Sequence, residues 1–290
     1  MYSIDGSGLP PEQELDHLEG YKGSRPVRIG NGADVQLQLD IYGEIMDAIY
    51  LSNKYSEAIS KDQWRRVCDL INWLRHNWNR PDEGIWEVRN GRKHLLHSRL
   101  MCWVAFDRAI RLALNRSLSA PLADWYEARD RINEDILDNF WDKDLQCFVQ
   151  AKGEKAIDAS VLLMPILRFI SPTDPRWLKT MEYVERCLTE DNLVFRYVCV
   201  DDGLEGREGC FTACSFWYIE CLARAGQLDK ARLLFDKMLG YANHLGLYSE
   251  QLGSNGEHLG NTPQALTHLA LIGAATYLDR RLDGVIDTWA

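Results

Sequence analysis

Residues 98–115 are apolar on almost every side that a helix would present. Large apolar side chains fill most of the stretch, from Leu100 and Trp103 to Ile110 and Leu112. A helix that is apolar all round must be surrounded by other elements, because a surface helix keeps one polar face toward water. The stretch therefore predicts a domain in which several helices pack around a central one.

Other stretches carry apolar residues at the spacing of an amphipathic helix. In the first of them, Leu37, Ile41, Ile45, Ala48 and Ile49 recur on one helix face. Strand-like alternation is nearly absent, so we predict an all-α chain with nine helices. Besides 98–115, the predicted helices are residues 33–54, 61–78, a stretch that follows Pro121, 156–169, 176–188, 211–225, 228–242 and 263–278.

Short and long connections alternate along the chain. If consecutive helices run antiparallel, the short turns fall at one end of the helices and the long loops at the other. Stacked helical hairpins form either an open solenoid or a closed toroid, and function concentrates in the loops of one rim. The short turns are residues 55–60, 117–120, 170–175 and 226–227, and the long loops are the segment before 33, then 79–97, 142–155, 189–210 and 243–262.

The charge balance limits the class of partner. The formal net charge is −10, and no cluster of lysine and arginine stands out. Nucleic acids and anionic membrane surfaces need a positive surface, so neither is expected as a partner, whereas a sugar is. No stretch is apolar for long enough to span a bilayer, and residues 1–6 lack the pattern of a signal peptide. The eight scattered cysteines predict reduced thiols and a cytoplasmic location, and we expect no metal site and no organic cofactor.

Two of the long loops hold a carboxylate beside aromatic residues. Glu87 follows Trp86, and Glu250 lies close to Tyr248. Hydrolysis of a glycosidic bond needs one carboxyl group to protonate the leaving oxygen and another to activate water. A neighbouring indole excludes water from the first of these and can stack on a sugar ring. Composition alone leaves other roles open, since a Trp-Glu pair is often only packed and solvated, and an exposed Glu often serves a helix dipole.

The loops and the segments around them resemble glycoside hydrolase family 15, the glucoamylases and related bacterial trehalases and glucodextranases. The similar segments follow one another in order through nearly the whole chain, which makes the resemblance specific. They are GYKGSRPVRIGN at 20–31, QLQLDIYGE at 36–44, GIWE at 84–87, residues 97–108, DGL at 202–204 with EG at 208–209, SEQ at 249–251, LGN at 259–261 and PQA at 263–265.

The resemblance implies an (α/α)6 toroid that hydrolyses α-glucosidic bonds with inversion. It makes Glu87 the general acid and Glu250 the general base, with Trp86 lining the site. Arg207 and Glu208 belong to a loop that approaches the sugar in the family. Tyr21, Arg25 and Arg28 either reach the substrate or belong to a glycine-hinged loop that anchors the helix behind it. His97, Trp103 and Asp107 are interpreted as core residues.

The resemblance also implies that this chain corresponds to the later part of a catalytic domain. The family toroid has twelve helices, and its Arg-Asp clamp for glucose comes before the segment that residues 2–6 match. We therefore expect residues 1–290 to be one partial (α/α)6 domain, completed by an amino-terminal segment or prone to self-association. By itself, the chain is expected to be inactive or nearly so.

Two other functions compete with hydrolysis of an α-glucan oligosaccharide or trehalose. A non-catalytic helical scaffold could bind a partner on its concave side, but it would not need paired carboxylates in its loops. A sugar epimerase on a similar helical frame would be favoured by histidines at the rim, such as His94, His97, His244 and His258.

Overall fold

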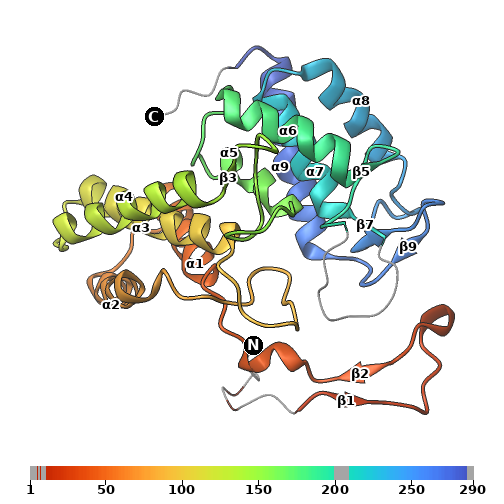
Figure 1. Ribbon diagram of the computed structural model, residues 1–290, viewed down its shortest axis with the longest axis horizontal. Helices are drawn as coiled ribbons and strands as arrows, with labels where there is room; N and C mark the ends of the chain where they lie inside the picture. Colours follow the sequence, from red (N-terminus) through yellow and green to blue (C-terminus); the bar gives the residue numbers. More distant parts are fainter. Residues whose placement is uncertain (1–4, 6, 8–10, 199–208, 286–290) are drawn as a thin grey trace.

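The computed structural model describes residues 5, 7, 11–198 and 209–285. Within them the fold is dominated by helices, as predicted, and its strands have only two residues each (Figure 1). The α-helices are α1 (Ile41–Tyr55), α2 (Lys61–Asn77), α3 (Leu96–Arg116), α4 (Leu122–Asn139), α5 (Leu163–Ile166), α6 (Pro175–Leu188), α7 (Thr212–Arg224), α8 (Leu228–Leu239) and α9 (Ala265–Leu282).

Two helices lie at the centre of the fold. Helix α3 is buried from Leu96 to Ile110, and α7 is buried from Thr212 to Ala223. Helices α1, α2 and α4 pack against α3, whereas α8 and α9 pack against α7. Figure 1 shows these two groups on opposite sides of the molecule. The apolar stretch at 98–115 thus forms the expected surrounded helix.

Local signals in the sequence explain where several helices begin. Ser60 and Gln63 form a capping box ahead of α2, in which each side chain binds the other residue's backbone N–H. Asp174 accepts a hydrogen bond from Arg176 N at the start of α6, and Pro175 occupies the first turn. In α1, a Cβ on Gly43 would lie 2.4 Å from the carbonyl oxygen of Met101, so α1 and α3 approach closely because this position is glycine.

The predicted helix at 33–54 is wrong in its first third. Residues 32–35 form a 3-10 turn, η2 (Gly32–Val35), and α1 begins only at Ile41. In the segment between them, two backbone N–H groups donate hydrogen bonds to side-chain carboxylates and not to the carbonyl groups of a helix. Leu37 N donates to Glu83, and Leu39 N donates to Asp82. These bonds come from residues more than forty positions away, so local periodicity could not reveal them.

The predicted helix at 156–169 is also shorter than expected. It consists of the 3-10 turn η3 (Ala159–Leu162) followed by the single turn of α5. Arg168 has a positive φ of 67°, and Phe169 N donates to Met164 O, which is a pattern that ends a helix.

Several helices expose large apolar side chains, among them α1 and α9. Ile41 of α1, which the sequence placed on the apolar face, is 48% exposed, and Leu269 of α9 is 66% exposed. Ile45 on α1 and Ile272 on α9 are exposed as well. The predicted apolar face of α1 is therefore wrong for most of its length, because Ile41, Ile45 and Ala48 are exposed and only Ile49 is half-buried, whereas the buried residues of α1 are Gly43 and Met46.

Short antiparallel strands stiffen the loops. β1 (Gln13–Glu14) pairs with β2 (Arg28–Ile29) in an arm, residues 11–35, that also contains the 3-10 turn η1 (Tyr21–Gly23) at its outer end. The remaining pairs are β3 (Trp141–Asp142) with β4 (Cys147–Phe148), β5 (Thr189–Glu190) with β6 (Leu193–Val194), and the sheet of β7 (Cys210–Phe211), β8 (Gln251–Leu252) and β9 (His258–Leu259). Across the described ranges, no helix combines the length and the apolar character that crossing a bilayer requires.

Candidate active site

The loop that carries Glu87 is closed by backbone bonds. Asp82 and Lys93 exchange two hydrogen bonds of 2.9 Å across its base. Inside the loop, Glu87 N donates to Gly84 O, and Glu87 itself has a positive φ of 53°. A non-glycine residue in this region is uncommon, and such residues often lie at functional sites. The loop thus holds Glu87 at the tip of a tight turn.

Glutamines from the segment before α1 contact Glu87. Gln36 Nε2 donates to the carbonyl oxygen of Glu87 at 3.2 Å, and Gln38 Nε2 lies 3.5 Å from Glu87 Oε1. Asp40, at the start of α1, is also close. Burial raises the pKa of Asp40 to about 6, and the negative charge of Glu87 adds to the increase. Two carboxyl groups therefore share this side of the loop.

Trp86 is fixed from behind by a buried carboxylate. Its indole nitrogen donates to Asp158 Oδ2 at 2.5 Å, and the hydroxyl of Ser160 donates to the same carboxylate. Burial raises the pKa of Asp158 to about 6. Because a hydrogen-bonded indole has one preferred orientation, the ring that precedes Glu87 is held in place.

Three rings form an aromatic cluster, which we define as Trp86, Tyr197 and Phe211. The ring of Trp86 meets Tyr197 and Phe211 edge to face, with centroids 6.3 and 5.7 Å away. The guanidinium of Arg196 lies over all three rings, at 5.6, 5.2 and 5.5 Å from their centroids. A cation over aromatic faces is attracted by their negative faces.

Glu250 lies at the base of the β8–β9 hairpin. Its backbone N–H donates to Asn261 O, and its backbone oxygen accepts from Thr212 N, both at 2.9 Å. Its side-chain Oε2 accepts from the backbone and side-chain nitrogens of Asn261, at 3.2 and 3.0 Å. A Cβ on Gly260 would lie 2.9 Å from this oxygen, so the carboxylate occupies space that only glycine leaves open.

The aromatic cluster joins the two loops. Phe211, which touches Trp86, is also the strand residue paired with Gln251. Glu87 directly follows Trp86, and Glu250 directly precedes Gln251. The structure thus brings the segments of both candidate carboxylates to one cluster, although they are far apart in the sequence.

The other predicted site residues lie elsewhere or outside the described ranges. Tyr21 is 69% exposed at the outer end of the arm, and the neighbouring Lys22 pairs with Glu257 at 3.5 Å. Arg25 is exposed on the same outer part of the arm. Arg207 and Glu208 fall in 199–208, which the structure does not describe.

Sequence reasoning missed Asp158 and Arg196. Asp158 is a lone acid ahead of the apolar run 159–167, and Arg196 stands in the run Leu-Val-Phe-Arg-Tyr-Val at 193–198. A charged residue within an apolar run has to find a partner or a function, and this was the available signal. It does not say which partner, because the rings come from distant segments.

A small cavity lies behind Trp86. Its volume is about 10 Å³, and His97, Gln150 and Asp158 are among the residues that line it. Within the described ranges, neither ring nitrogen of His97 has a hydrogen-bond partner, and burial lowers its pKa to about 4. Because burial disfavours the charged imidazolium, His97 is a neutral core residue beside this cavity, whose space suffices for about one water molecule. Among described residues, no three of the His, Cys, Asp and Glu side chains gather in a way that could hold a metal ion.

The sequence matches proteins of known class. The model of glycosyl hydrolases family 15 matches residues 1–276. Trehalase from Mycobacterium tuberculosis is 43% identical over 283 residues, which are 97% of this chain and 42% of that protein. Trehalase from Thermoplasma volcanium is also 43% identical over 283 residues, covering 97% of this chain and 45% of its own length. The chain thus spans less than half the length of these relatives.

Solved structures show the same fold. A wild-type glycosidase superimposes with a TM-score of 0.74 at 20% identity, covering 89% of this chain and 72% of its own. A bacterial glucoamylase complexed with acarbose gives a TM-score of 0.66 at 16% identity, covering 84% of this chain and 41% of its own. The predicted class, a glucoamylase-like (α/α)6 arrangement of helices, is confirmed. On its sequence and its fold, the chain belongs to family 15 of the glycosyl hydrolases.

Proposed function

We propose that residues 1–290 form part of the catalytic domain of an inverting α-glucosidase, with trehalose as the first candidate substrate and α-linked glucose oligomers as the second. The observation that carries this proposal is the contact of Trp86 with Phe211, because it joins the segment of Glu87 to that of Glu250. The similarity to proteins named trehalase supports trehalose in particular.

In the proposed reaction, Glu250 removes a proton from a water molecule, which attacks the anomeric carbon of glucose. Glu87 donates its proton to the leaving oxygen as the glycosidic bond breaks. Attack on the face opposite the leaving group inverts the configuration, so an α-glucoside yields β-glucose. Afterwards Glu87 is charged and Glu250 is protonated, and proton exchange with water restores both.

The aromatic cluster is proposed to bind the sugar. Aromatic rings stack on the apolar faces of pyranoses, and Trp86 is held in one orientation by Asp158. The guanidinium of Arg196, positioned over the cluster, supplies hydrogen-bond donors for hydroxyl groups. Tyr21, Arg25, Arg207 and Glu208 remain proposed substrate contacts.

The surroundings of the domain are proposals too. We propose that the exposed apolar faces of α1 and α9 are covered in the active protein, by a further polypeptide segment or by self-association, because apolar patches favour association. The seven cysteines in the described ranges carry free thiols, which supports a cytoplasmic location.

The test is glucose release from trehalose, maltose and isomaltose. We would assay the chain itself and a chimaera in which it replaces the matched part of the Thermoplasma volcanium trehalase, because the chain spans less than half of that protein. Release of glucose by either preparation supports the proposal. A chimaera that folds like its active parent, as judged by circular dichroism and thermal melting, yet hydrolyses none of the three sugars contradicts it.

A further inference from the structure

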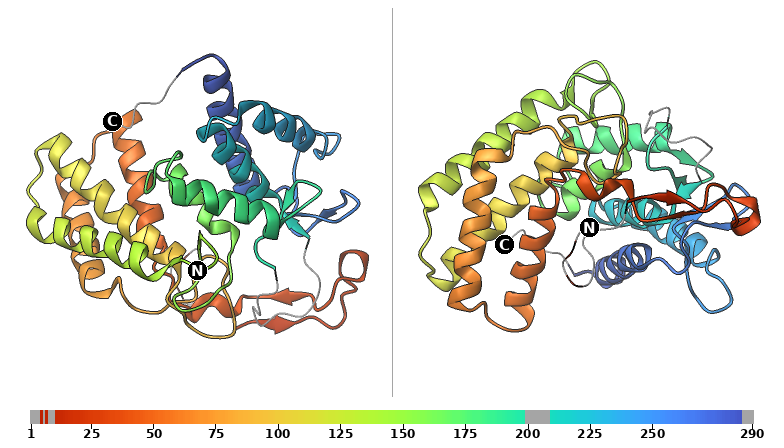
Figure 2. Two further views of the ribbon diagram at one scale, coloured as in Figure 1. Left: turned by 45° about the horizontal axis from the view of Figure 1, so that its top comes forward. Right: turned by 90° about the horizontal axis from the view of Figure 1, so that it is seen from below.

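The arm formed by residues 11–35 reaches from the loop that carries Glu87 to the β8–β9 hairpin that follows Glu250. Figure 2 shows it passing from the α1 side of the molecule toward the β8–β9 hairpin. Its two strands are paired at Gln13 with Ile29 and at Glu14 with Arg28, and Leu15 N donates to Val27 O beyond them. The inner half of the arm is therefore a hydrogen-bonded ribbon, and local turns shape its outer end, where Gly23 N donates to Gly20 O and Ser24 N to Tyr21 O.

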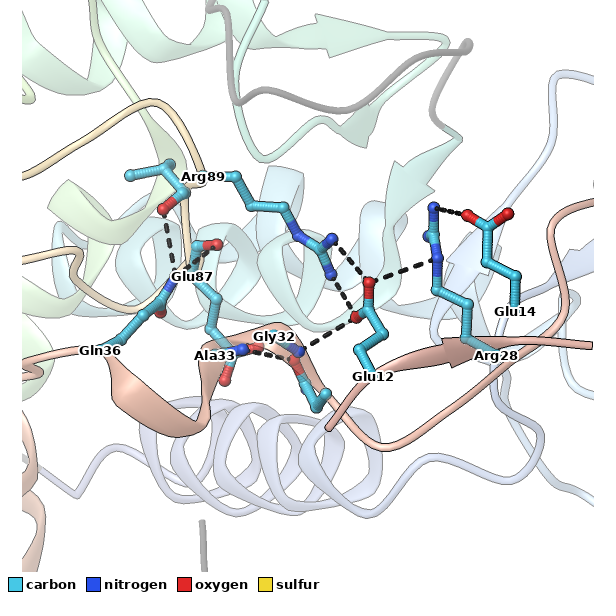
Figure 3. Close-up of polar contacts among 10 residues, drawn as sticks. Glu12, Glu14, Arg28, Gly32, Ala33, Gln36, Glu87 and Arg89 are labelled. Atoms are coloured by element: carbon cyan, nitrogen blue, oxygen red, sulfur yellow. Dashed lines mark hydrogen bonds and ion pairs between the residues drawn. The ribbon is translucent and has the colours of Figure 1, made fainter. Parts of the chain in front are cut away.

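At its inner end the arm grips the loop of Glu87 through Glu12. Both oxygens of Glu12 accept hydrogen bonds from Arg89, at 3.0 and 2.8 Å (Figure 3). One of them also accepts from Gly32 N at 3.0 Å, and Arg28 lies 3.4 Å from the other. Arg89 is only two residues beyond Glu87. A bidentate pair of this kind fixes direction as well as distance.

The segment that follows the arm holds the same loop from the other side. Gln36 Nε2 donates to the carbonyl oxygens of both Glu87 and Val88 at 3.2 Å (Figure 3). Glu83 N donates to Leu37 O, and Leu37 N donates to the Glu83 carboxylate. The loop is thus attached on one side of its tip to the arm, and on the other side to the segment that follows the arm.

At its outer end the arm meets the hairpin of Glu250. Lys22 lies 3.5 Å from Glu257, in the turn between β8 and β9. The turn is closed by Gly253 N donating to Glu257 O at 2.9 Å. Glu250 immediately precedes β8, so the turn and the carboxylate lie on the same short hairpin.

We propose that the arm is a strap that sets the position of Glu87 relative to Glu250, and that Glu12 and Arg89 are positioning residues for the reaction. The part of this inference that concerns catalysis rests on the proposed function. The reason is geometric, because two carboxyl groups that flank one bond must be placed to a fraction of an ångström, and a misplacement of about 1 Å can cost on the order of a hundredfold. The arm adds a connection between the two loops to the one that the aromatic cluster provides.

The pair is suited to positioning more than to stability. The side chains of Glu12 and Arg89 are 22% and 36% exposed, and partly exposed ion pairs add little to the free energy of unfolding. We therefore expect its removal to loosen the loop while the helical body stays folded. This difference separates a strap from an ordinary structural contact.

The first experiment needs no activity. Hydrogen exchange followed by mass spectrometry is compared for the unmodified chain, Glu12→Gln and the matched control Glu14→Gln, which removes the neighbouring pair with Arg28. Glu12→Gln should speed exchange at residues 84–91 by about tenfold and leave α3 and α7 unchanged. Glu14→Gln should leave residues 84–91 unchanged. Equal exchange at 84–91 in all three proteins overturns the strap, whatever the fate of the proposed function.

The second experiment applies to the preparation that hydrolyses a glucoside. Glu12→Gln and Arg89→Gln should each lower kcat by about tenfold and change KM by less than twofold. The double variant should be no worse than either single variant, because both remove the same pair. Additive losses, or a change confined to KM, would show that Glu12 and Arg89 do not position Glu87 as a pair.

Discussion

The indole nitrogen of Trp86 donates a hydrogen bond of 2.5 Å to Asp158, a carboxylate that is almost fully buried. Trp86 and Ser160 are neutral donors, so they stabilise the charged form of Asp158 less than a cation would. Burial accordingly prevails and raises the pKa of Asp158 to about 6. The residue that orients the ring beside Glu87 is therefore sensitive to pH in the neutral range.

This shift predicts a pH-dependent stability. Because the folded pKa of Asp158 is higher than the unfolded value of 3.8, its contribution is present below about pH 4 and is lost as the pH rises through about 6. Asp158→Asn can still accept the bond from Trp86 but does not titrate. Between pH 4 and 7.5 its free energy of unfolding should fall by roughly 2 kcal/mol less than that of the unmodified chain.

The measurement for Asp158 is urea unfolding at a series of pH values. Asp62→Asn is the control, since Asp62 lies on the surface of α2 with a side chain that is 83% exposed. Burial also raises the pKa values of Asp40 and Asp82 to about 6. Part of the pH dependence of stability therefore remains in every variant. An identical pH dependence in Asp158→Asn and the unmodified chain would contradict a raised pKa for Asp158.

Glu250→Gln tests the proposed base. Without a carboxylate to accept the proton of water, turnover of every α-glucoside should fall by several orders of magnitude. The hydrogen bonds with Asn261 can be kept by the glutamine, so the hairpin should remain intact. The readout is kcat on trehalose in the active preparation, with circular dichroism as the control for folding. Retention of more than a tenth of the activity would exclude Glu250 as the base.

Glu87→Gln tests the proposed acid. The fluoride ion of a glucosyl fluoride leaves without being protonated, whereas the leaving oxygen of a disaccharide needs a proton. The variant should therefore lose far more activity on trehalose than on glucosyl fluoride. The ratio of the two losses is measured by initial rates. Equal losses on both substrates would remove Glu87 from this role.

The stereochemistry of the product gives an independent check. On trehalose, whose two glucose units are joined through two α anomeric carbons, inversion predicts β-glucose from the attacked unit and α-glucose from the leaving unit in equal amounts, detected by proton NMR before mutarotation. Release of both units as α-glucose would contradict inversion. Inversion also requires a water molecule between the substrate and the base, so the two carboxyl groups should lie roughly 6.5–9.5 Å apart in a complex with a substrate analogue. This separation stays a prediction.

Much of the fold could be predicted because it depends on local patterns. The all-round apolarity of 98–115 identified the central helix, and apolar periodicity placed the starts of α2 and α6 to within one residue. The extended segment before α1 could not be predicted, since its shape depends on the carboxylates of Asp82 and Glu83 in a distant loop. Periodicity records which face is apolar and does not record what covers it, as the exposed Ile41 shows.

The candidate site divides in the same way. Glu87 and Glu250 could be proposed from the sequence because each lies in a short motif with aromatic neighbours, and their roles stay predictions. Asp158 and Arg196 were missed because their importance arises from contacts with Trp86, which is 72 residues from Asp158 in the sequence. Glu12 is a similar case, since its partner Arg89 is 77 positions away. Long-range polar contacts have no local signature.

The acid range offers a last test, directed at Glu12. The hydrogen bonds from Arg89 lower the pKa of Glu12 from 4.5 to about 2, with further help from Gly32 N and from the positive charges of Arg89 and Arg28. A lowered folded pKa means that the pair contributes at every pH above about 4.5, and that this contribution is lost as the pH falls through about 2. The arm should therefore stay attached to the loop of Glu87 under mildly acidic conditions.

The midpoint for Glu12 can be read from the side-chain carboxyl carbon by NMR titration. It should lie near pH 2 in the unmodified chain and move up toward 4.5 in Arg89→Gln, because the strongest of its hydrogen bonds is then gone. Arg28→Gln is the matched control and should move it less, since Arg28 acts on Glu12 through charge alone. Two results would contradict the contact between Arg89 and Glu12 at the inner end of the strap. One is a midpoint near pH 4.5 in the unmodified chain, and the other is an equal change of the midpoint in Arg89→Gln and Arg28→Gln.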